Sequence, residues 1–406
     1  MVKDRLAVLR PKQVRGHNSA AVLGFLRRFE TMSRAELSRQ SGLSEGTVSR
    51  IVAALCAQRL VSEIGEENTT GGRPSTRLQL SDVPRAIGVE IKNWETRFAI
   101  STLRGQLTET LVVRTPASPE LTVQLIAEQA RRYAKLHPCL HGVGVAVRGL
   151  VDSRTGVVAV GNDPGWLQVP LKDLLAKRLA LPIWVENDVR AATQAEYYYT
   201  NGGGHAPRCL LYVNVTEGVG VGIVMNGTIY AGASMAAGEF GQMVIADDGG
   251  DLRHDRPGCL EMLVSDQAVC DRFAQQQGKK SSRAADSAAR VRRICRLAME
   301  GDRDAEEAVR QTVRYLALGV ANMAFALDPE VIILNTTLNP AWPLLMEGIR
   351  AQLPDKAQWP AFQKLSILPS VLGEEGALIG AATLPFAPLF ESVSTGMALL
   401  PEQLQA

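Results

Sequence analysis

The clearest pattern of hydrophobic and polar positions near the start of the chain runs from Ser33 to Leu60. Apolar residues recur at helical spacing in two short stretches, which Gly42 and Leu43 separate. Ser44 stands just before the second stretch, where its hydroxyl can accept a hydrogen bond from an unpaired backbone N–H as an N-cap. The pattern predicts two short amphipathic helices joined by a tight turn, the helix-turn-helix arrangement.

The second of these helices is predicted to have a buried face and an exposed face. The inward positions are Val48, Ile51, Val52 and Leu55. In a helix-turn-helix the first turns of the second helix read base edges in the major groove. We therefore predict DNA contacts from Ser44, Glu45, Thr47, Ser49 and Arg50. A helical hairpin in an all-α domain is the alternative for this stretch taken alone.

A β-hairpin is predicted directly after the two helices. Short β-like runs at 60–64 and 75–80 flank a turn rich in Gly and Thr, with Arg73 after two glycines at its tip. Such an arginine can enter a narrow minor groove, where the negative potential is deepest. An ordinary hairpin with an incidental arginine is the alternative. Beside a helix-turn-helix we favour a wing, and we predict a winged-helix DNA-binding domain over residues 1–82 with Arg73 as a contact.

Beyond about residue 83 the pattern changes to strands that alternate with helices. Strand patterns cover 85–114, 141–151, 182–186, 209–215 and 329–334, and helix patterns cover 119–136, 188–199, 305–327 and the end of 372–384. This alternation predicts an α/β body with a mostly parallel or mixed sheet. We expect two lobes, residues 83–200 and residues 201–406.

The distribution of charge fits this division of the chain. Residues 1–85 contain 14 Lys and Arg against 8 Asp and Glu, whereas the remainder contains 30 against 34. A basic module joined to a mildly acidic body suits a DNA-binding head on a sensing or catalytic body. Six scattered cysteines, no secretion signal and no apolar run long enough to span a membrane lead us to expect a cytoplasmic protein with reduced thiols.

Several short motifs, in order along the body, resemble the ROK family of repressors and sugar kinases. They are GNDPGW at 161–166, VENDVRAATQAE at 185–196, the Gly-rich run at 215–242, GCLE at 258–261, DPEVIIL at 328–334 and GALIGAA at 376–382. The resemblance implies a two-lobed, actin-like (ribonuclease H-like) sugar-kinase body behind the winged helix. It also implies that Asp188 stands at the general-base position of the kinases. The residues implied to contact a sugar are Asn162, Asn187, Asp188, Glu239, Gln242 and Glu261.

Two departures from the family pattern bear on function. Where the kinases carry an Asp-x-Gly-Gly-Thr phosphate loop, this chain has Glu90-Ile91-Lys92-Asn93-Trp94, and a later Gly-Gly is replaced by Asn335-Thr336. Glycines let a backbone approach phosphates closely, so we expect no efficient kinase and read Asp188 as a vestigial base. The family's zinc ligands, one His and three Cys, are here Gln242, Leu252, His254 and Cys259, so we expect no metal and no cofactor.

These observations favour a DNA-binding transcriptional regulator, a repressor, controlled by a sugar or sugar derivative bound in a kinase-like cleft. Reading a palindromic operator requires a homodimer or a dimer of dimers. Two alternatives stay open. One is a sugar kinase with a regulatory head, and the other is a regulator that responds to a partner protein.

Overall fold

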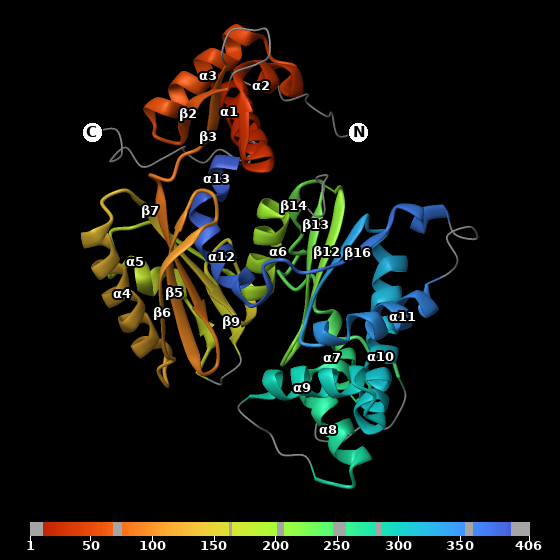
Figure 1. The fold of residues 1–406 in the computed structure, drawn as a ribbon. Helices are drawn as coiled ribbons and strands as arrows, with labels where there is room; N and C mark the ends of the chain where they lie inside the picture. The colour runs from red at the N-terminus through yellow and green to blue at the C-terminus, as the bar shows by residue number, and fades with distance from the viewer. Residues whose placement is uncertain are drawn as a thin grey trace, which may run out of the picture. The chain divides into compact units, whose positions relative to one another are not determined.

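The computed structural model describes residues 11–67, 75–161, 165–200, 207–246, 257–280, 286–353 and 360–390. The chain forms two compact units (Figure 1). Unit 1 contains residues 1–191 together with 377–406, and unit 2 contains residues 192–376. The two crossings between the units fall in the helices α6 (Asp188–Tyr199) and α12 (Gly376–Thr383). Among the described residues, no helix is long and apolar enough to cross a membrane.

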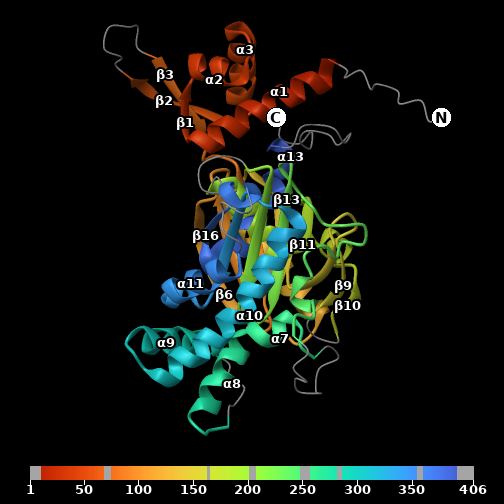
Figure 2. The same cartoon turned by 90° about the vertical axis from the view of Figure 1, so that its right-hand side faces the viewer.

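The first part of unit 1 is a winged helix, as the sequence predicts, and we call it the head. Its helices are α1 (Pro11–Phe29), α2 (Arg34–Ser41) and α3 (Glu45–Ala57). Its strands β1 (Thr31–Ser33), β2 (Val61–Glu67) and β3 (Ser75–Leu80) form an antiparallel sheet in the order β1-β3-β2 (Figure 2). The strand β1 was not predicted. The predicted inward residues Val48, Ile51, Val52 and Leu55 are all buried.

The main sheet of unit 1 has five strands in the order β11-β7-β4-β5-β6. They are β4 (Arg85–Ile91), β5 (Glu95–Thr102), β6 (Leu107–Arg114), β7 (Leu140–Val147) and β11 (Ile183–Asn187). The strands β4, β7 and β11 are parallel to one another. The helices α4 (Pro119–Leu136) and α5 (Leu171–Ala176) share a buried core with the apolar positions of this sheet, among them Ile87 and Val89.

A second, small sheet in unit 1 was not predicted. It consists of β8 (Gly149–Asp152), β9 (Val157–Gly161) and β10 (Leu167–Val169), in the order β10-β9-β8. The sequence pattern predicted one strand over 141–151. In the structure β7 ends at Val147, and Gly149 at φ +123° lies against the backbone of Val160, so the chain turns between β7 and β8. A side chain would be strained at that φ, so Gly149 makes the turn possible.

The C-terminal helices of the described chain belong to unit 1. The helix α12 covers the sheet where β4 and β7 carry Gly88 and Gly144, and a Cβ on either glycine would meet Ala382 or the Ala381 carbonyl. A 3₁₀ turn, η6 (Leu384–Phe386), leads to α13 (Ala387–Phe390), and Phe386 and Leu389 are buried in the core of the head. This packing joins the described residues 377–390 to unit 1, whereas the sequence pattern placed them with the second lobe.

Unit 2 is built on a five-stranded mixed sheet in the order β14-β13-β12-β15-β16. The strands are β12 (Cys209–Val215), β13 (Val219–Met225), β14 (Thr228–Ile229), β15 (Val331–Thr336) and β16 (Ser366–Pro369). The long helix α10 (Arg303–Leu327) shares a core with one face of this sheet, and on the other face Gly222 lies against Thr193 of α6. Four further helices were not predicted: α7 (Leu260–Val264), α8 (Asp266–Gln276), α9 (Ser287–Met299) and α11 (Trp342–Gln352).

The start of α2 is held by a capping box, which leads to a testable prediction. The Ser33 hydroxyl accepts a hydrogen bond from the Glu36 amide (3.2 Å), and the Glu36 carboxylate accepts one from the Ser33 amide (2.7 Å) and pairs with Arg77 (2.6 Å). Replacing Ser33 with alanine removes the cap and should destabilise α2 by about 1 kcal/mol.

Hydrogen exchange on the full chain tests this prediction. The amides of α2 should exchange several-fold faster in Ser33→Ala than in the wild type, while Ser33→Thr, which keeps a hydroxyl, should stay close to the wild type. Equal protection of α2 in all three proteins would contradict the prediction.

Candidate nucleic-acid interface and ligand site

The second helix of the helix-turn-helix, α3, begins as the sequence predicts. Ser44 is its N-cap, and the Ser44 hydroxyl accepts a hydrogen bond from the Thr47 amide (3.3 Å). The preceding turn contains Gly42 at φ +70°, which ends α2 in the left-handed conformation that glycine adopts without strain. The positions predicted to contact DNA have exposed side chains at Ser44, Glu45, Ser49 and Arg50, and a half-buried one at Thr47.

Arg50 is held along the outer face of α3. Its Nε donates to the Gly46 carbonyl (3.3 Å) and its Nη2 lies 3.5 Å from the Thr47 hydroxyl. The guanidinium is therefore oriented toward the first turn of the helix and keeps further donors for a base or a phosphate. Arg73, predicted at the tip of the wing, lies outside the described residues.

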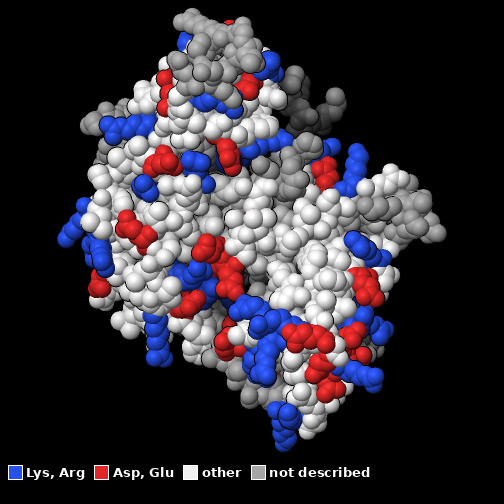
Figure 3. All heavy atoms as spheres, in the orientation of Figure 1, with Lys and Arg blue, Asp and Glu red and all other residues white. Residues whose placement is uncertain are grey.

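Charge is dispersed over the face of the molecule shown in Figure 3. On that face the described Lys and Arg side chains are interspersed with Asp and Glu, and they do not gather into one field of a single sign.

Three polar residues stand side by side at the edge of the unit 1 sheet where the parallel strands end. The last paired residues of β4, β7 and β11 are Ile91, Val147 and Asn187. The residues that follow them in the chain are Lys92, Arg148 and Asp188, and the charges of Lys92 and Arg148 act on the Asp188 carboxyl group. Ligands of open α/β sheets bind at the carboxyl ends of the strands, so this row is a candidate ligand site.

Two opposing effects act on the pKa of Asp188. Burial raises the pKa of Asp188, and the positive charges of Arg148 and Lys92 act in the opposite direction. A carboxyl group beside two cations can accept hydrogen bonds from hydroxyl groups of a ligand. The sequence prediction named Asp188 and missed Lys92, which becomes a neighbour only through the strand register.

Asn187, predicted to contact a sugar, is engaged in positioning α6. Its Oδ1 accepts a hydrogen bond from the Arg190 amide (2.9 Å), and its Nδ2 donates to the Gly149 carbonyl (3.0 Å) and to Asp188 Oδ1 (3.0 Å). Asn187 therefore caps α6 and orients the Asp188 carboxylate.

A buried ion pair lies at the junction of β11 and α6, next to Asn187 and Asp188, and the sequence analysis did not predict it. The guanidinium of Arg190 lies 2.6 Å from the Glu186 carboxylate and donates to the Val151 carbonyl (2.7 Å). Arg190 is 4% exposed. Its burial depends on the small sheet that packs beside α6, and no local pattern distinguishes it from an exposed helix cation.

The segment at the place of the kinase phosphate loop is a tight turn between β4 and β5. The Lys92 amide donates to the Glu95 carbonyl (2.9 Å), so this backbone N–H is used within the turn. Glu90 is buried and pairs with Arg97 (3.1 Å) and Lys92 (3.7 Å). Burial raises the pKa of Glu90, and the charges of Lys92 and Arg97 oppose this effect. Trp94 in this turn is 69% exposed.

Three further predicted sugar contacts lie in unit 2, near the start of β13. Glu239 directly precedes a single 3₁₀ turn, η2 (Phe240–Gln242), Gln242 is the last residue of this turn, and both are exposed. Glu261 of α7 accepts a hydrogen bond from the Val219 amide (2.9 Å), so part of its carboxylate holds the strand. Asn162 lies outside the described residues. The structure thus groups Glu239, Gln242 and Glu261 in unit 2, and Asn187 with Asp188 in unit 1.

The carboxyl ends of β12 and β15 in unit 2 carry polar side chains that bond to one another. Asn335 donates to Asn214 (2.8 Å), and Thr337 donates to the buried carboxylate of Asp266 at the start of α8. Burial raises the pKa of Asp266 to about 6, against the effect of the Thr337 hydrogen bond. The folded state therefore binds this proton more tightly than the unfolded chain, whose ordinary Asp value is 3.8.

This raised pKa predicts a pH-dependent effect of Asp266→Asn. Between the pKa of the unfolded chain and that of the folded protein, the unfolded chain loses the Asp266 proton more readily than the folded protein does. The contribution of Asp266 to the free energy of unfolding therefore falls as the pH rises from about 4 to about 6. Asparagine cannot ionise. The free energy of unfolding of Asp266→Asn minus that of the wild type should therefore be about 2 kcal/mol greater at pH 7.5 than at pH 4.5.

Urea unfolding of both proteins at the two pH values measures this difference. The variant Asp286→Asn, which replaces the exposed N-cap of α9, serves as the control for loss of a carboxylate. A difference between Asp266→Asn and the wild type that is the same at both pH values would contradict the prediction.

The described members of the family's zinc set do not fit a metal. Gln242 is exposed and offers an amide, and the Cys259 backbone pairs with Val244 while its side chain is buried. Leu252 and His254 lie outside the described residues, and leucine offers no ligand atom. Among the described residues, no group of three or more His, Cys, Asp or Glu is placed to hold a metal ion.

The fold and these sites define a class of protein, a winged-helix head on a sugar-kinase-like body. The ROK family model matches residues 86–386, and the MarR family model matches residues 17–73. The chain belongs to the ROK family.

Two relatives and one solved structure illustrate the similarity. The xylose repressor of Bacillus spizizenii is 25% identical over 366 residues, which cover 87% of this chain and 90% of the repressor. The glucokinase of Streptomyces coelicolor is 27% identical over 313 residues, or 74% of this chain and 98% of the kinase. The crystal structure of a ROK family transcriptional regulator, a homolog of the E. coli MLC protein, superposes with a TM-score of 0.74 at 21% identity and covers 93% of this chain and 97% of its own.

Proposed function

We propose that this protein is a DNA-binding transcriptional regulator, a repressor, whose ROK body binds a sugar or sugar derivative. The observation that carries the proposal is the capped helix α3, which presents Ser44, Glu45, Ser49 and Arg50 to solvent, in one chain with a ROK body. A helix-turn-helix with such a face inserts its second helix into the major groove. The match to the xylose repressor extends over both the head and the body, whereas the match to the glucokinase covers 74% of this chain.

We further propose that the body is not an efficient kinase. The Lys92 amide is used in the β4–β5 turn, and the Glu90 carboxylate is paired with Arg97 and Lys92, so this turn has no free glycine backbone to approach a phosphate. In unit 2 Asn335-Thr336 stands at the place where the resemblance puts a glycine pair of the kinases, and the Asn335 amide donates to Asn214 (2.8 Å). Both features support a body that binds a sugar without transferring phosphate to it.

The proposed route from the body to the head runs through the C-terminal helices of unit 1. The helix α12 lies on Gly88 and Gly144 of the sheet that carries the Lys92–Arg148–Asp188 row, and α13 continues into the core of the head. A ligand that favours one position of α12 would thereby bias the head. The homodimer or dimer of dimers, the cytoplasmic location and the absence of a cofactor remain predictions of this proposal.

The test is fluorescence anisotropy of the full protein on its own upstream DNA, titrated with neutral sugars and sugar phosphates. Specific binding that one compound releases or strengthens supports the proposal. Specific DNA binding that no compound alters would favour the alternative that a partner protein, and not a sugar, controls the regulator. Absence of specific DNA binding would contradict the proposal that the protein is a transcriptional regulator.

The kinase alternative has a separate assay. Transfer of phosphate from ATP to a hexose at an enzymatic rate, abolished in Asp188→Asn, would overturn the assignment of a non-enzymatic body. We expect no transfer above the rate of the variant.

A further inference from the structure

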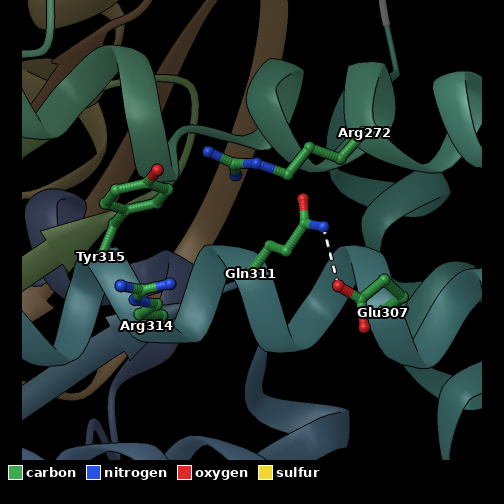
Figure 4. Close-up of a pocket in the computed structure, with 5 residues that line it drawn as sticks. All are labelled: Arg272, Glu307, Gln311, Arg314 and Tyr315. Atoms are coloured by element: carbon green, nitrogen blue, oxygen red, sulfur yellow. Dashed lines mark hydrogen bonds between the residues drawn. The ribbon is translucent and has the colours of Figure 1, made fainter. Parts of the chain in front are cut away.

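A pocket on unit 2 is lined by none of the residues discussed above as DNA or sugar contacts. It occupies about 380 Å³ between α8 and α10. Its lining residues are Arg272 of α8 and Glu307, Gln311, Arg314 and Tyr315 of α10 (Figure 4). This volume is within the range of sites for small molecules, about 300–1,000 Å³.

Arg272 is half-buried and forms no salt bridge with a described residue, although the charge of the neighbouring Asp271 acts on it and opposes the effect of burial on its pKa. Its Nη1 donates to the Thr312 hydroxyl (2.7 Å), and its guanidinium carbon lies 5.3 Å from the centroid of the Tyr315 ring. Burial lowers the pKa of Arg272. Arg272 makes no ion pair with any residue that the structure describes. A half-buried cation that forms no salt bridge is stabilised by an anion that enters the pocket.

The second arginine of the pocket is also without a carboxylate partner within the described chain. Arg314 is exposed and forms no ion pair with a described residue. Glu307 is the acidic residue of the lining, and it accepts a hydrogen bond from Gln311 Nε2 (2.7 Å). Glu307 and Tyr315 are eight residues apart on α10, about 12 Å along the helix, so the carboxylate stands at the far end of the row from the Tyr315 ring (Figure 4).

The lining also offers neutral hydrogen-bonding groups. Gln311 uses its amide nitrogen for Glu307, and its side-chain oxygen is turned toward Arg272 in Figure 4. Tyr315 adds a phenolic hydroxyl at the opposite end. Guanidinium groups bind phosphate oxygens with paired N–H donors, and amide and phenol groups suit the hydroxyls of an attached sugar or polyol.

We propose that this pocket is a binding site for a phosphate group, held by Arg272 and Arg314. The phosphate comes either as free inorganic phosphate or as the ester of a small metabolite, and the pocket volume leaves room for the ester. The site is distinct from the proposed sugar site, because none of the residues assigned to the sugar lines it. Its existence does not depend on the sugar proposal.

Equilibrium dialysis of the full chain against radiolabelled orthophosphate tests the site. The variants are Arg272→Gln and Arg314→Gln, and the control is Arg310→Gln. Arg310 lies on the same helix but pairs with Glu306 (2.8 Å) and Glu347 (3.3 Å), so it has its own carboxylates. We expect one phosphate per chain in the wild type and in the control, and binding at least tenfold weaker in each of the other two variants.

Arg314→Gln keeps the test decisive if Arg272→Gln disturbs the packing of α8 on α10, because the Arg314 side chain is exposed. Unchanged phosphate binding in Arg314→Gln, with the fold intact by circular dichroism, overturns the proposal, as does absence of saturable binding in the wild type.

Competition with glucose 6-phosphate and with glucose identifies the source of the phosphate group. Displacement of orthophosphate by glucose 6-phosphate at lower concentration than by unlabelled phosphate identifies a phosphate ester as the ligand. Equal or weaker displacement identifies free phosphate. Displacement by glucose alone would overturn the proposal, since a site that glucose occupies would not be selecting the phosphate.

Discussion

Replacing Arg50 with alanine is expected to weaken binding to the operator by about 1–3 kcal/mol, which is roughly a 5- to 150-fold rise in the dissociation constant. Arg50 lies on the exposed face of α3, with its guanidinium directed along the first turn by the Gly46 carbonyl and the Thr47 hydroxyl. The variant removes donors that would bind a base edge, and it leaves the buried face of α3 unchanged.

Fluorescence anisotropy at fixed salt concentration measures this loss, with specific and unrelated DNA compared side by side. The control is Arg293→Ala, which removes the same charge from an exposed position on α9 in unit 2. We expect the control to bind like the wild type. Equal affinity of Arg50→Ala and the wild type for the operator would refute our assignment of α3 as the reading helix, whereas an equal loss on unrelated DNA would make Arg50 a phosphate contact.

Gly144→Ala is expected to destabilise the protein by about 3 kcal/mol or more. A Cβ at this position of β7 would lie 1.8 Å from the carbonyl oxygen of Ala381, and 3.1 Å from Pro385. The obstacle is backbone, so the added methyl group is accommodated only if α12 moves away from the sheet. Because α13 follows α12 into the core of the head, the anchoring of the head should also weaken.

Calorimetric unfolding of the full chain checks this prediction. The matched control is Gly24→Ala, inside α1, where the added Cβ would meet nothing within 4 Å apart from its chain neighbours and the backbone of its own helix. Alanine is the better helix former there, and we expect this variant to be about 0.5–1 kcal/mol more stable than the wild type. A Gly144→Ala variant that unfolds at the wild-type temperature would show that α12 is not held against β7.

Local sequence patterns were enough to predict those caps, turns and helix faces that depend only on residues adjacent in the sequence. The Ser44 cap, the Gly42 turn and the inward face of α3 follow from the 3.6-residue period and from capping chemistry, and all three agree with the structure. The strands β4, β5 and β6 also follow from their alternating pattern. Ordered motifs identified the ROK body, and the family match over residues 86–386 confirms it.

Other features could not be derived locally, because they depend on packing between distant segments. The small sheet β8-β9-β10 depends on the turn at Gly149. The helices α8 and α9 are a different case, because their buried residues recur at helical spacing, and the sequence analysis missed this local signal.

The sequence by itself thus determined the class of head, the family of the body and the residue types available for chemistry. The tertiary structure alone decided which of those residues become neighbours. The register of three parallel strands places Lys92 and Arg148 beside Asp188, the capping of α6 engages Asn187, and the packing of α12 on Gly88 and Gly144 joins the C-terminal helices to unit 1. The physical reason is that helix period, capping and turn chemistry act over a few residues. Strand register and close backbone approach are instead fixed by contacts between segments far apart in the chain.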